Sequence, residues 1–435
     1  MSGADPGKDG DCGTNSGDGE RAEAAPWLHV IGMQPGMART QLCAHAQHAL
    51  DEAEIVYGAP RHLMALGVAD KKIRNWPSPL ANALDELRHQ ATRKTAVVAS
   101  GDPLCHGIGT MLLRTFSAKD VRFFPAPSSF SLAVNRLGWS MQHVHCLSAH
   151  GRDTVDVMLR AAPGARMLVL TSDGAQPLQI AKQLARIGFG EAQLHVLETL
   201  GATDECIVSG NANEMAHRRE PFAALNLLAI DCTPIPDAQA LPAVPGLPMD
   251  VWDHDGQVTK PEVRAATLAA LAPMPRGVLW DVGAGCGSVA VEWVRASLAM
   301  LPPDRTRAFA IEPRADRLAK LATNNDRLAG GGVTIIEGRA PDALTQLSTP
   351  DAVFIGGAVA NDDIFSACWD ALPAGGRCVA NAVTLEGDAA LIARHGRLGG
   401  SLTRIDIAVC EPVGPLRGMR PRMSVLQWRT VKEAP

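Results

Sequence analysis

Residues 278–295 read VLWDVGAGCGSVAVEWVR, and this stretch predicts the fold of the region around it. Residues 278–282 form a short apolar run typical of a buried parallel strand, and the apolar residues from 289 to 298 are spaced as on a helix. Between them lies the turn Gly283-Ala-Gly285-Cys-Gly287. Because glycine has no Cβ, such a turn lets backbone N–H groups and the positive end of the helix approach a ligand closely.

The glycine spacing favours one ligand over another. A dinucleotide fingerprint needs its third glycine at position 288, where this chain has Ser288. The GxGxG form preceded by Asp281 favours S-adenosylmethionine, because a carboxylate can hold the ammonium of its methionine end. The next apolar strand ends in Glu312, which can accept hydrogen bonds from two ribose hydroxyls. The alternatives are another nucleotide, or a tight strand–helix joint without a ligand.

Length and composition limit the class of protein. At 435 residues the chain is too long for one ordinary core, so two or three domains are expected. A net charge of −5 and 4% aromatic residues favour no nucleic-acid partner. No apolar run reaches membrane-spanning length, and the first residues do not resemble a signal peptide. The ten cysteines form no CxxC pair and no metal-ligand cluster, so we expect free thiols, no metal and a cytoplasmic location.

The pattern along the chain predicts α/β domains. Residues 1–26 are rich in Gly, Asp, Ser and Glu and are expected to be disordered. Residues 27–230 begin with alternating strands and helices, then have more strands than helices after a polar loop at 148–152, which predicts two lobes, the second with a mixed sheet. The proline-rich residues 231–250 predict a linker. Residues 251–431 predict a doubly wound sheet with a final antiparallel hairpin, the pattern of a class I methyltransferase.

Polar residues also follow strands in the N-terminal part. Gly32 follows the first strand, Gly101 and Asp102 follow the buried strand at 95–99, and Ser128 and Ser129 follow the strand at 121–124. Open α/β sheets bind ligands at the carboxyl ends of their strands, so these positions predict a second site. The alternative is a plain Gly-Pro turn and a serine helix cap.

Longer motifs carry a resemblance to known families. The C-terminal part contains GQVTKPEVRA, LWDVGAGCGSVAVEW, AIEPRADR, EGRAPDAL, PDAVFIGG and NAVTLE, and it resembles the decarboxylating precorrin methyltransferases that act on carbon 15. The N-terminal part contains ASGDPLCHGIGT, PAPSSFSLAVNRLGW, LSAHGRD and VLETLGATDE, and it resembles the tetrapyrrole methylases, here one that acts on carbon 5. In this order the two parts resemble the fused precorrin C(5,15)-methyltransferase family of cobalamin biosynthesis.

The resemblance implies a fold, two cofactor sites and a homo-oligomer. The expected fold is a two-lobed tetrapyrrole methylase (class III) domain followed by a Rossmann-like class I domain. The implied reaction converts precorrin-6B to precorrin-8X: the N-terminal half methylates carbon 5, and the C-terminal half methylates carbon 15 and removes carbon dioxide from the ring-C acetate. The expected S-adenosylmethionine contacts are Thr259, Asp281, Gly283, Ala284, Gly285, Cys286, Gly287, Glu312 and Ala340 in one site and Gly32, Gly101, Asp102, Ser128 and Ser129 in the other.

A precorrin carries several carboxylates, so arginines are expected to bind it. The candidates are His150 and Arg152 in the AHGRD loop, Asn381 after a strand, and Arg417 and Arg420 with Arg422 in the loop PLRGMRPR. The alternatives are a solvated basic loop and a histidine that binds only backbone. No residue is predicted to be the base for decarboxylation, because the conjugated ring can accept the electrons.

Two rival functions remain open. One is methylation of RNA or of another small molecule, because a fold does not fix a substrate. The other is a scaffold in which one half has lost its cofactor site. Gln34 favours this second possibility for the N-terminal half, because it stands where relatives have glycine in a GxGPG loop.

Overall fold

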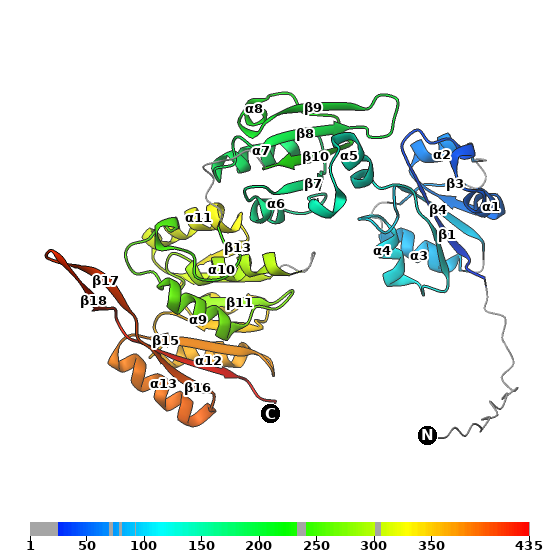
Figure 1. Ribbon diagram of the computed structural model, residues 1–435. Coiled ribbons are helices and arrows are strands. Elements are labelled where there is room, and N and C mark those ends of the chain that lie inside the picture. Colours follow the sequence, from blue (N-terminus) through cyan, green and yellow to red (C-terminus); the bar gives the residue numbers. More distant parts are fainter. Residues whose placement is uncertain are drawn as a thin grey trace, which may run out of the picture. The chain divides into compact units, whose positions relative to one another are not determined.

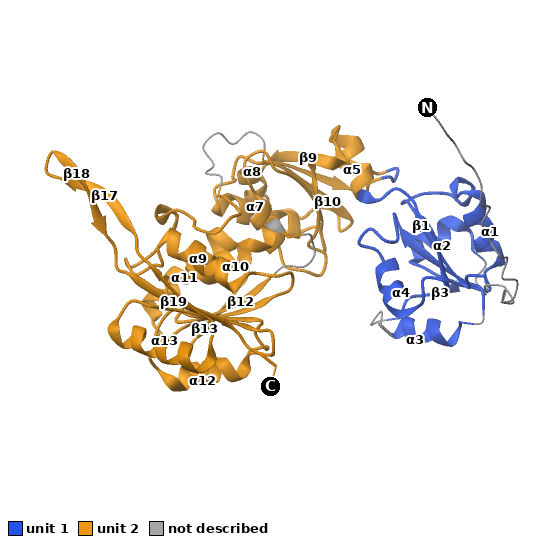
Figure 2. Cartoon of the chain, turned by 60° about the horizontal axis from the view of Figure 1, so that its bottom comes forward, with its two compact units in different colours: residues 1–129, 201–203 blue, residues 130–200, 204–435 orange. Residues whose placement is uncertain are grey.

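The computed structural model describes residues 25–68, 73–77, 81–91, 93–232, 241–300 and 306–434. The chain divides into two compact units, Met1–Ser129 with Gly201–Thr203, and Phe130–Leu200 with Asp204–Pro435 (Figure 2). Most of the expected disordered tail, residues 1–24, lies outside the described residues, as do residues 233–240 of the expected linker.

The first unit contains a five-stranded parallel sheet in the order β3-β2-β4-β1-β5. Val30 belongs to the apolar cluster on one face of this sheet and Ile31 to the cluster on the other, so the sheet is covered on both sides. The parallel order was expected from the alternation of strands and helices. The elements are β1 Leu28–Met33, α1 Ala44–Glu52, β2 Ile55–Tyr57, α2 Pro60–Leu66, β3 Ile73–Arg74, α3 Ala81–His89, β4 Thr95–Ser100, α4 Gly109–Thr115 and β5 Val121–Phe124.

The second unit begins with a mixed sheet in the order β6-β7-β10-β8-β9. Only the β6–β7 pair is parallel, and the other pairs are antiparallel, which confirms the expected mixed sheet. The six-residue helices α6 and α8 were not expected, because so short a segment has no clear helical periodicity. The elements are α5 Ser129–Leu137, β6 His145–Ser148, α6 Val155–Arg160, β7 Arg166–Leu170, α7 Gln176–Arg186, β8 Gln193–Glu198, β9 Cys206–Asn211, α8 Ala212–His217 and β10 Asn226–Asp231.

The C-terminal sheet has the order β13-β12-β11-β14-β15-β19-β16. Its first five strands are parallel, and β19 is antiparallel to both neighbours. Leu279 packs with α9–α11, whereas its neighbour Trp280 packs with α12 and α13, so helices cover both faces and the doubly wound fold is confirmed. The elements are α9 Pro261–Leu271, β11 Val278–Val282, α10 Ser288–Arg295, β12 Arg307–Glu312, α11 Ala315–Ala329, β13 Val333–Glu337, β14 Ala352–Ile355, α12 Asp362–Ala371, β15 Arg377–Ala382, α13 Leu385–Leu398, β16 Ser401–Ile405 and β19 Val425–Val431.

The segment before β19 differs from the prediction. Residues 403–411 were expected to be one strand, but β16 ends at Ile405 and β17 is Ala408–Val413. The expected loop PLRGMRPR is mostly the strand β18, Leu416–Pro421, which pairs with β17 in a separate two-stranded ribbon (Figure 1). Prolines are tolerated here because both strands of a two-stranded ribbon are edge strands, which need no N–H on the outer side.

Helix α6 joins the two sheets within the second unit. Val155 and Leu159 belong to the same apolar cluster as Trp293 of α10. An added Cβ at Gly332 would lie 3.0 Å from Val155 Cγ1, so a glycine permits this approach. The two predicted domains, residues 27–230 and 251–431, therefore share apolar contacts. Their limits remain a prediction.

Candidate functional site

A cavity of about 750 Å³ lies at the carboxyl ends of β11, β12 and β14. Most of the cofactor contacts expected in the C-terminal domain line it, namely Thr259, Asp281, Gly283, Ala284, Gly285, Cys286, Glu312 and Ala340. Gly287 is not among the lining residues. It precedes α10 with φ of 82°, and an added Cβ would lie 2.8 Å from Leu321 Cγ. Gly287 therefore faces α11 and allows close packing there.

The glycine turn needs its glycines for geometry. Gly283 and Gly285 have φ of 76° and 60°. The N–H groups of Gly283 and Ala284 donate to Ile311 O at 3.0 and 3.1 Å, which ties the turn to the end of β12. An added Cβ at Gly283 would lie 3.0 Å from Gly357 N, whereas one at Gly285 would meet no atom within 4 Å. The turn is thus packed on one side and open on the other.

Asp281 lines the cavity and has one buried carboxylate oxygen without a hydrogen-bond partner among the described residues. Its side chain is 1% exposed, and Oδ2 accepts a hydrogen bond from Ala290 N at 3.0 Å. Oδ1 has no hydrogen-bond partner among the described residues. Burial, and to a smaller extent the charge of Glu312, raises the pKa of Asp281 to about 7. A buried carboxylate oxygen without a hydrogen-bond partner is well suited to bind a cationic group of a ligand, because the cation would replace the interactions with water that burial removes.

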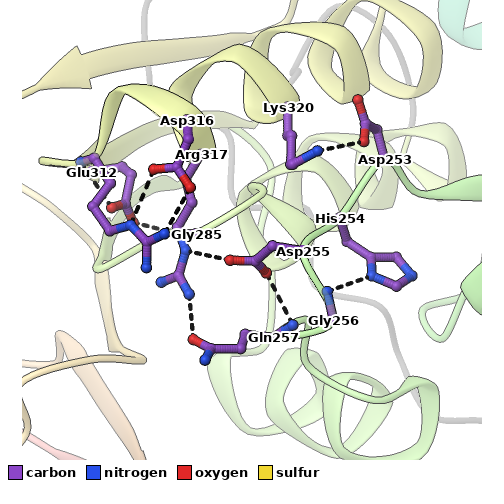
Figure 3. Close-up of polar contacts among 11 residues, drawn as sticks. Asp253, His254, Asp255, Gly256, Gln257, Gly285, Glu312, Asp316, Arg317 and Lys320 are labelled. Carbon is purple, nitrogen blue, oxygen red and sulfur yellow. Dashed lines mark hydrogen bonds and ion pairs between the residues drawn. The ribbon is translucent and has the colours of Figure 1, made fainter.

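Glu312 is fixed at the edge of the same cavity. Its Oε2 accepts from Gly285 N at 2.8 Å (Figure 3). Its Oε1 accepts from Arg314 N at 3.1 Å. Each carboxylate oxygen keeps a second lone pair, so both can still accept a hydroxyl. The carboxylate is therefore oriented by the backbone before any ligand arrives.

Thr259 is held at the cavity by a buried ion pair. Arg264 Nη1 donates to Thr259 O at 2.5 Å, while Arg264 Nε donates to Glu292 Oε1 at 2.6 Å. Both charged side chains are almost completely buried. The position of Thr259 thus depends on helices α9 and α10, which lie against the sheet.

Asn381 is one of two candidate substrate residues that line the cavity, and Arg422 is the other. Its Nδ2 donates to Thr267 Oγ1 at 3.0 Å, and its Oδ1 accepts from Gln427 Nε2 at 3.0 Å. The amide is therefore held in one orientation by residues of α9 and β19.

Arg417 and Arg420 are not among the residues that line this cavity. Both lie on β18, where Arg417 is exposed and Arg420 Nε lies 3.2 Å from Glu411 Oε2. Arg422, just beyond the strand, does line the cavity and lies 2.9 Å from the other oxygen of Glu411. The predicted loop is instead a ribbon, and this ribbon places Arg417 and Arg420 away from the sheet. Arg422, which lies beyond the ribbon, is therefore the arginine of this segment at the cavity.

His150 and Arg152 lie in the second lobe, outside the cavity lining. Both are exposed, and His150 Nδ1 lies 3.3 Å from Thr171 O, the backbone contact that was the alternative interpretation.

The candidate residues of the N-terminal site lie together in the first unit. An added Cβ at Gly32 would be 2.2 Å from Gly101 O, so only glycine allows β1 and the loop after β4 to approach this closely. Asp102 Oδ1 accepts from Leu104 N at 2.8 Å, and Ser128 and Ser129 follow β5. Because β4, β1 and β5 are neighbours, all five residues lie at one edge of the sheet.

Several lining residues were not predicted from the sequence. They include three basic side chains: Lys260, which precedes α9, and Arg314 and Arg317, which lie at the start of α11. The motif AIEPRADR contained the last two, and its position after the second strand could have indicated them. Among the described residues, no three His, Cys, Asp or Glu side chains form a metal-binding group, and no helix is both long and apolar enough to cross a membrane.

Two known families match consecutive parts of the chain. The family of tetrapyrrole (corrin/porphyrin) methylases matches residues 28–216, and the precorrin methyltransferase domain family matches residues 250–432. A Sinorhizobium protein named precorrin-6Y C(5,15)-methyltransferase [decarboxylating] is 42% identical over 416 residues, which cover 95% of this chain and 98% of that protein.

Two shorter relatives each match part of the chain. A Salmonella typhimurium cobalt-precorrin-7 C(5)-methyltransferase is 28% identical, over 41% of this chain and 88% of its own length. A Pyrobaculum calidifontis protein named "Probable cobalt-precorrin-6B C(15)-methyltransferase (decarboxylating)" is 32% identical, over 36% of this chain and 80% of its own. The resemblance that the sequence motifs indicated is confirmed over nearly the whole chain, and the protein belongs to the family of decarboxylating precorrin-6Y C(5,15)-methyltransferases.

Proposed function

We propose that this chain uses S-adenosylmethionine to methylate precorrin-6B at carbons 5 and 15 and to decarboxylate its ring-C acetate, giving precorrin-8X in cobalamin biosynthesis. The observation that carries the proposal is the pairing of two buried carboxylates, Asp281 and Glu312, at one cavity beside a glycine turn. The name and near-complete coverage of the Sinorhizobium relative support the reaction and the substrate.

The residues of the cavity fit this cofactor. The unpartnered Oδ1 of Asp281 would hold the methionine ammonium, and the remaining lone pairs of Glu312 would accept the ribose hydroxyls. Gly285, whose Cβ position is open, leaves room between the two. The backbone of Ala340, after β13, would meet the adenine edge.

The cofactor supplies an electrophilic methyl group, so the protein mainly has to place the reacting carbon in line with it. Asn381 and Arg422 would orient the substrate from the cavity wall, Arg422 through a carboxylate. The macrocycle itself can accept electrons during loss of carbon dioxide, and we assign no base to this step.

The division of labour follows the two domain families. We assign carbon 5 to the N-terminal half, and carbon 15 with decarboxylation to the C-terminal half, because separate relatives carry one of these activities each. A second cofactor site would then be formed around Gly32, Gly101, Asp102, Ser128 and Ser129.

Mass spectrometry of the products tests this assignment in the full-length protein. With Glu312→Ala, the product should gain one methyl and keep its carboxyl group, whereas Asp102→Ala should leave only the C-terminal methylation and decarboxylation. Calorimetric titration with S-adenosylhomocysteine should give two sites per chain. One site would favour the scaffold alternative, and methylation of RNA but not of the precorrin would overturn the proposal.

The proposal includes a homo-oligomer in the cytoplasm. The ribbon β17–β18 exposes Val413, Leu416 and Met419 at 59%, 73% and 66%, which is unusual for a free surface. The described cysteines are all free, as in a reducing compartment. Sedimentation of the variant with serine at these three positions should give a smaller particle than the natural chain, and an unchanged particle would exclude the ribbon as the interface.

A further inference from the structure

One face of α11 binds the segment that precedes α9. Arg327 donates to Val251 O at 2.7 Å, and Asn324 exchanges two hydrogen bonds of 2.9 Å with the backbone of Asp253. Lys320 lies 3.0 Å from Asp253 Oδ1, and Arg317 lies 2.9 Å from Asp255 Oδ2 (Figure 3). Positions 317, 320, 324 and 327 share one helix face, so these contacts form a continuous row.

The bound segment forms part of the cavity wall. Gly256, Gln257, Val258, Thr259 and Lys260 line the cavity, and so does Arg317. Asp255 is not among the lining residues. The contact between Arg317 and Asp255 therefore lies behind the wall that a ligand would meet.

Both ends of this segment are anchored by buried groups. At one end, the fully buried Asn324 binds Asp253 and also donates to Cys286 O in the glycine turn at 3.0 Å. At the other end, Arg264 donates to Thr259 O. These two anchors fix the segment before and after residues 254–257.

Residues 254–257 depend on Arg317 for their position. Among the described side chains, Arg317 alone makes polar contacts between this stretch and the rest of the domain, to Asp255 Oδ2 and to Gln257 Oε1. An added Cβ at Gly256 would meet no atom within 4 Å, so little packs against the backbone there. The ion pair is partly exposed, with side-chain exposures of 17% for Arg317 and 24% for Asp255, and is therefore open to screening by salt.

The shape of this stretch is kept by its own hydrogen bonds. Gly256 N donates to His254 Nδ1, and Gln257 N donates to Asp255 Oδ1, both at 2.9 Å. The hydrogen bond from Gln257 N, and then Arg317, holds the pKa of Asp255 below its ordinary value, so the carboxylate stays charged near neutral pH. These internal hydrogen bonds keep the shape of the stretch without the help of Arg317.

We propose that residues 254–257 form a cover over the cofactor cavity and that Arg317 latches this cover, which makes Arg317 a positioning residue that slows release of the cofactor. This inference rests on the proposed binding of S-adenosylmethionine in this cavity. It assigns the latch to the contacts of Arg317 with Asp255 and Gln257, and not to a direct contact of Arg317 with the ligand.

Stopped-flow dissociation of S-adenosylhomocysteine from the full-length protein tests the latch. Arg317→Ala should raise the dissociation rate about tenfold, the combined effect of one part-exposed ion pair and one hydrogen bond. Arg317→Lys should give an intermediate rate, because lysine can keep the charge but not the two-partner geometry. Salt should accelerate release from the natural chain and have less effect on Arg317→Ala.

Asp255→Ala separates a latch from a direct ligand contact. Since Asp255 does not line the cavity, its loss should speed release only through the cover, and the double variant with Arg317→Ala should release no faster than Arg317→Ala alone. Arg404→Ala is the matched control, because Arg404 pairs with Asp388 at 2.8 Å outside the cavity lining. It should release at the natural rate.

The outcomes distinguish this inference from the proposed function. Suppose that Glu312→Ala weakens the binding of S-adenosylhomocysteine, but Arg317→Ala and Asp255→Ala release it at the rate of the unchanged protein. The latch is then overturned and the cofactor site stands. If Arg317→Ala speeds release while Asp255→Ala does not, Arg317 contacts the ligand directly and the latch is again overturned. If the natural chain binds no S-adenosylhomocysteine at Glu312, the proposed function fails first.

Discussion

Arg264 Nε donates to Glu292 Oε1 across 2.6 Å, and the two side chains are 0% and 2% exposed. Glu292 also accepts from the backbone N–H groups of Gly246 and Leu247, at 2.7 and 2.8 Å. The guanidinium carbon lies 4.8 Å from the ring centroid of Trp252. One buried pair thus connects the chain entering the domain, two helices of the core and, through Thr259, the wall of the cavity.

Removal of Arg264 should destabilise the protein strongly. Arg264→Ala leaves the carboxylate of Glu292 buried without a cation, and we expect a loss of about 3–5 kcal/mol in the free energy of unfolding. Urea denaturation measures this loss. The double change Arg264→Met with Glu292→Leu should cost less than Arg264→Ala, because it leaves no buried charge. A loss below about 1 kcal/mol, the range of a surface pair such as Arg404 with Asp388, would contradict the buried pair.

Cofactor affinity should rise with pH through neutrality because of Asp281. Burial, then the charge of Glu312, raises its pKa to about 7, so the folded protein holds a proton below that pH. The pKa of Asp281 is higher in the folded than in the unfolded chain. Its protonation therefore contributes fully to the free energy of unfolding in acid, and this contribution is lost as pH rises through about 7. An ammonium ligand requires the charged carboxylate, and its binding should release a proton below neutral pH.

Calorimetry in buffers of different ionisation enthalpy measures that proton release. Asp281→Asn should lower the affinity for S-adenosylhomocysteine and abolish the pH dependence around neutrality. An unchanged pH dependence in this variant would mean that another group titrates.

Two glycines with similar backbone angles allow strain and crowding to be separated. Gly283 and Gly375 have φ of 76° and 82°, but an added Cβ would lie 3.0 Å from Gly357 N at the first and meet nothing within 4 Å at the second. Gly375→Ala should cost about 1 kcal/mol of unfolding free energy from backbone strain alone. Gly283→Ala should cost more and also weaken cofactor binding. Equal losses in thermal unfolding, with equal affinities, would refute the close approach at Gly283.

Arg422 and Arg417 should differ in their effect on the tetrapyrrole substrate. Arg422 lines the cavity, whereas Arg417 is exposed on the ribbon β17–β18. Arg422→Ala should raise KM for the precorrin about tenfold, the value of one charge-assisted hydrogen bond, and Arg417→Ala should leave KM unchanged. Steady-state kinetics decides the point, and an equal rise in both would show that the ribbon itself binds substrate.

The parts of the fold that could be predicted from the sequence are those with local signals. The strand at 278–282, the glycine turn and the helix after it are contiguous, and Glu312 follows at the end of the next strand. The carboxyl ends of parallel strands meet at one edge, so these residues were expected to meet. The apolar runs of the second lobe likewise predicted its mixed sheet.

The parts that could not be predicted depend on contacts between distant residues. The bond between Arg317 and Asp255 joins positions 62 residues apart, and in sequence Arg317 belongs to a charged run typical of a solvated helix end. The ribbon β17–β18 was missed because its prolines and arginines are typical of a loop, and pairing with each other is what makes these segments strands.

The glycines beside α6 affect how the enzyme can be divided. An added Cβ at Gly330 would lie 2.6 Å from Met158 Cβ, and one at Gly332 would lie 3.0 Å from Val155 Cγ1. Val294, Leu328 and Val333 share an apolar cluster with this helix. A fragment cut at the proline-rich segment would expose these apolar side chains to water, so a separately expressed C-terminal half should be less soluble than the full-length chain, in which α6 covers them.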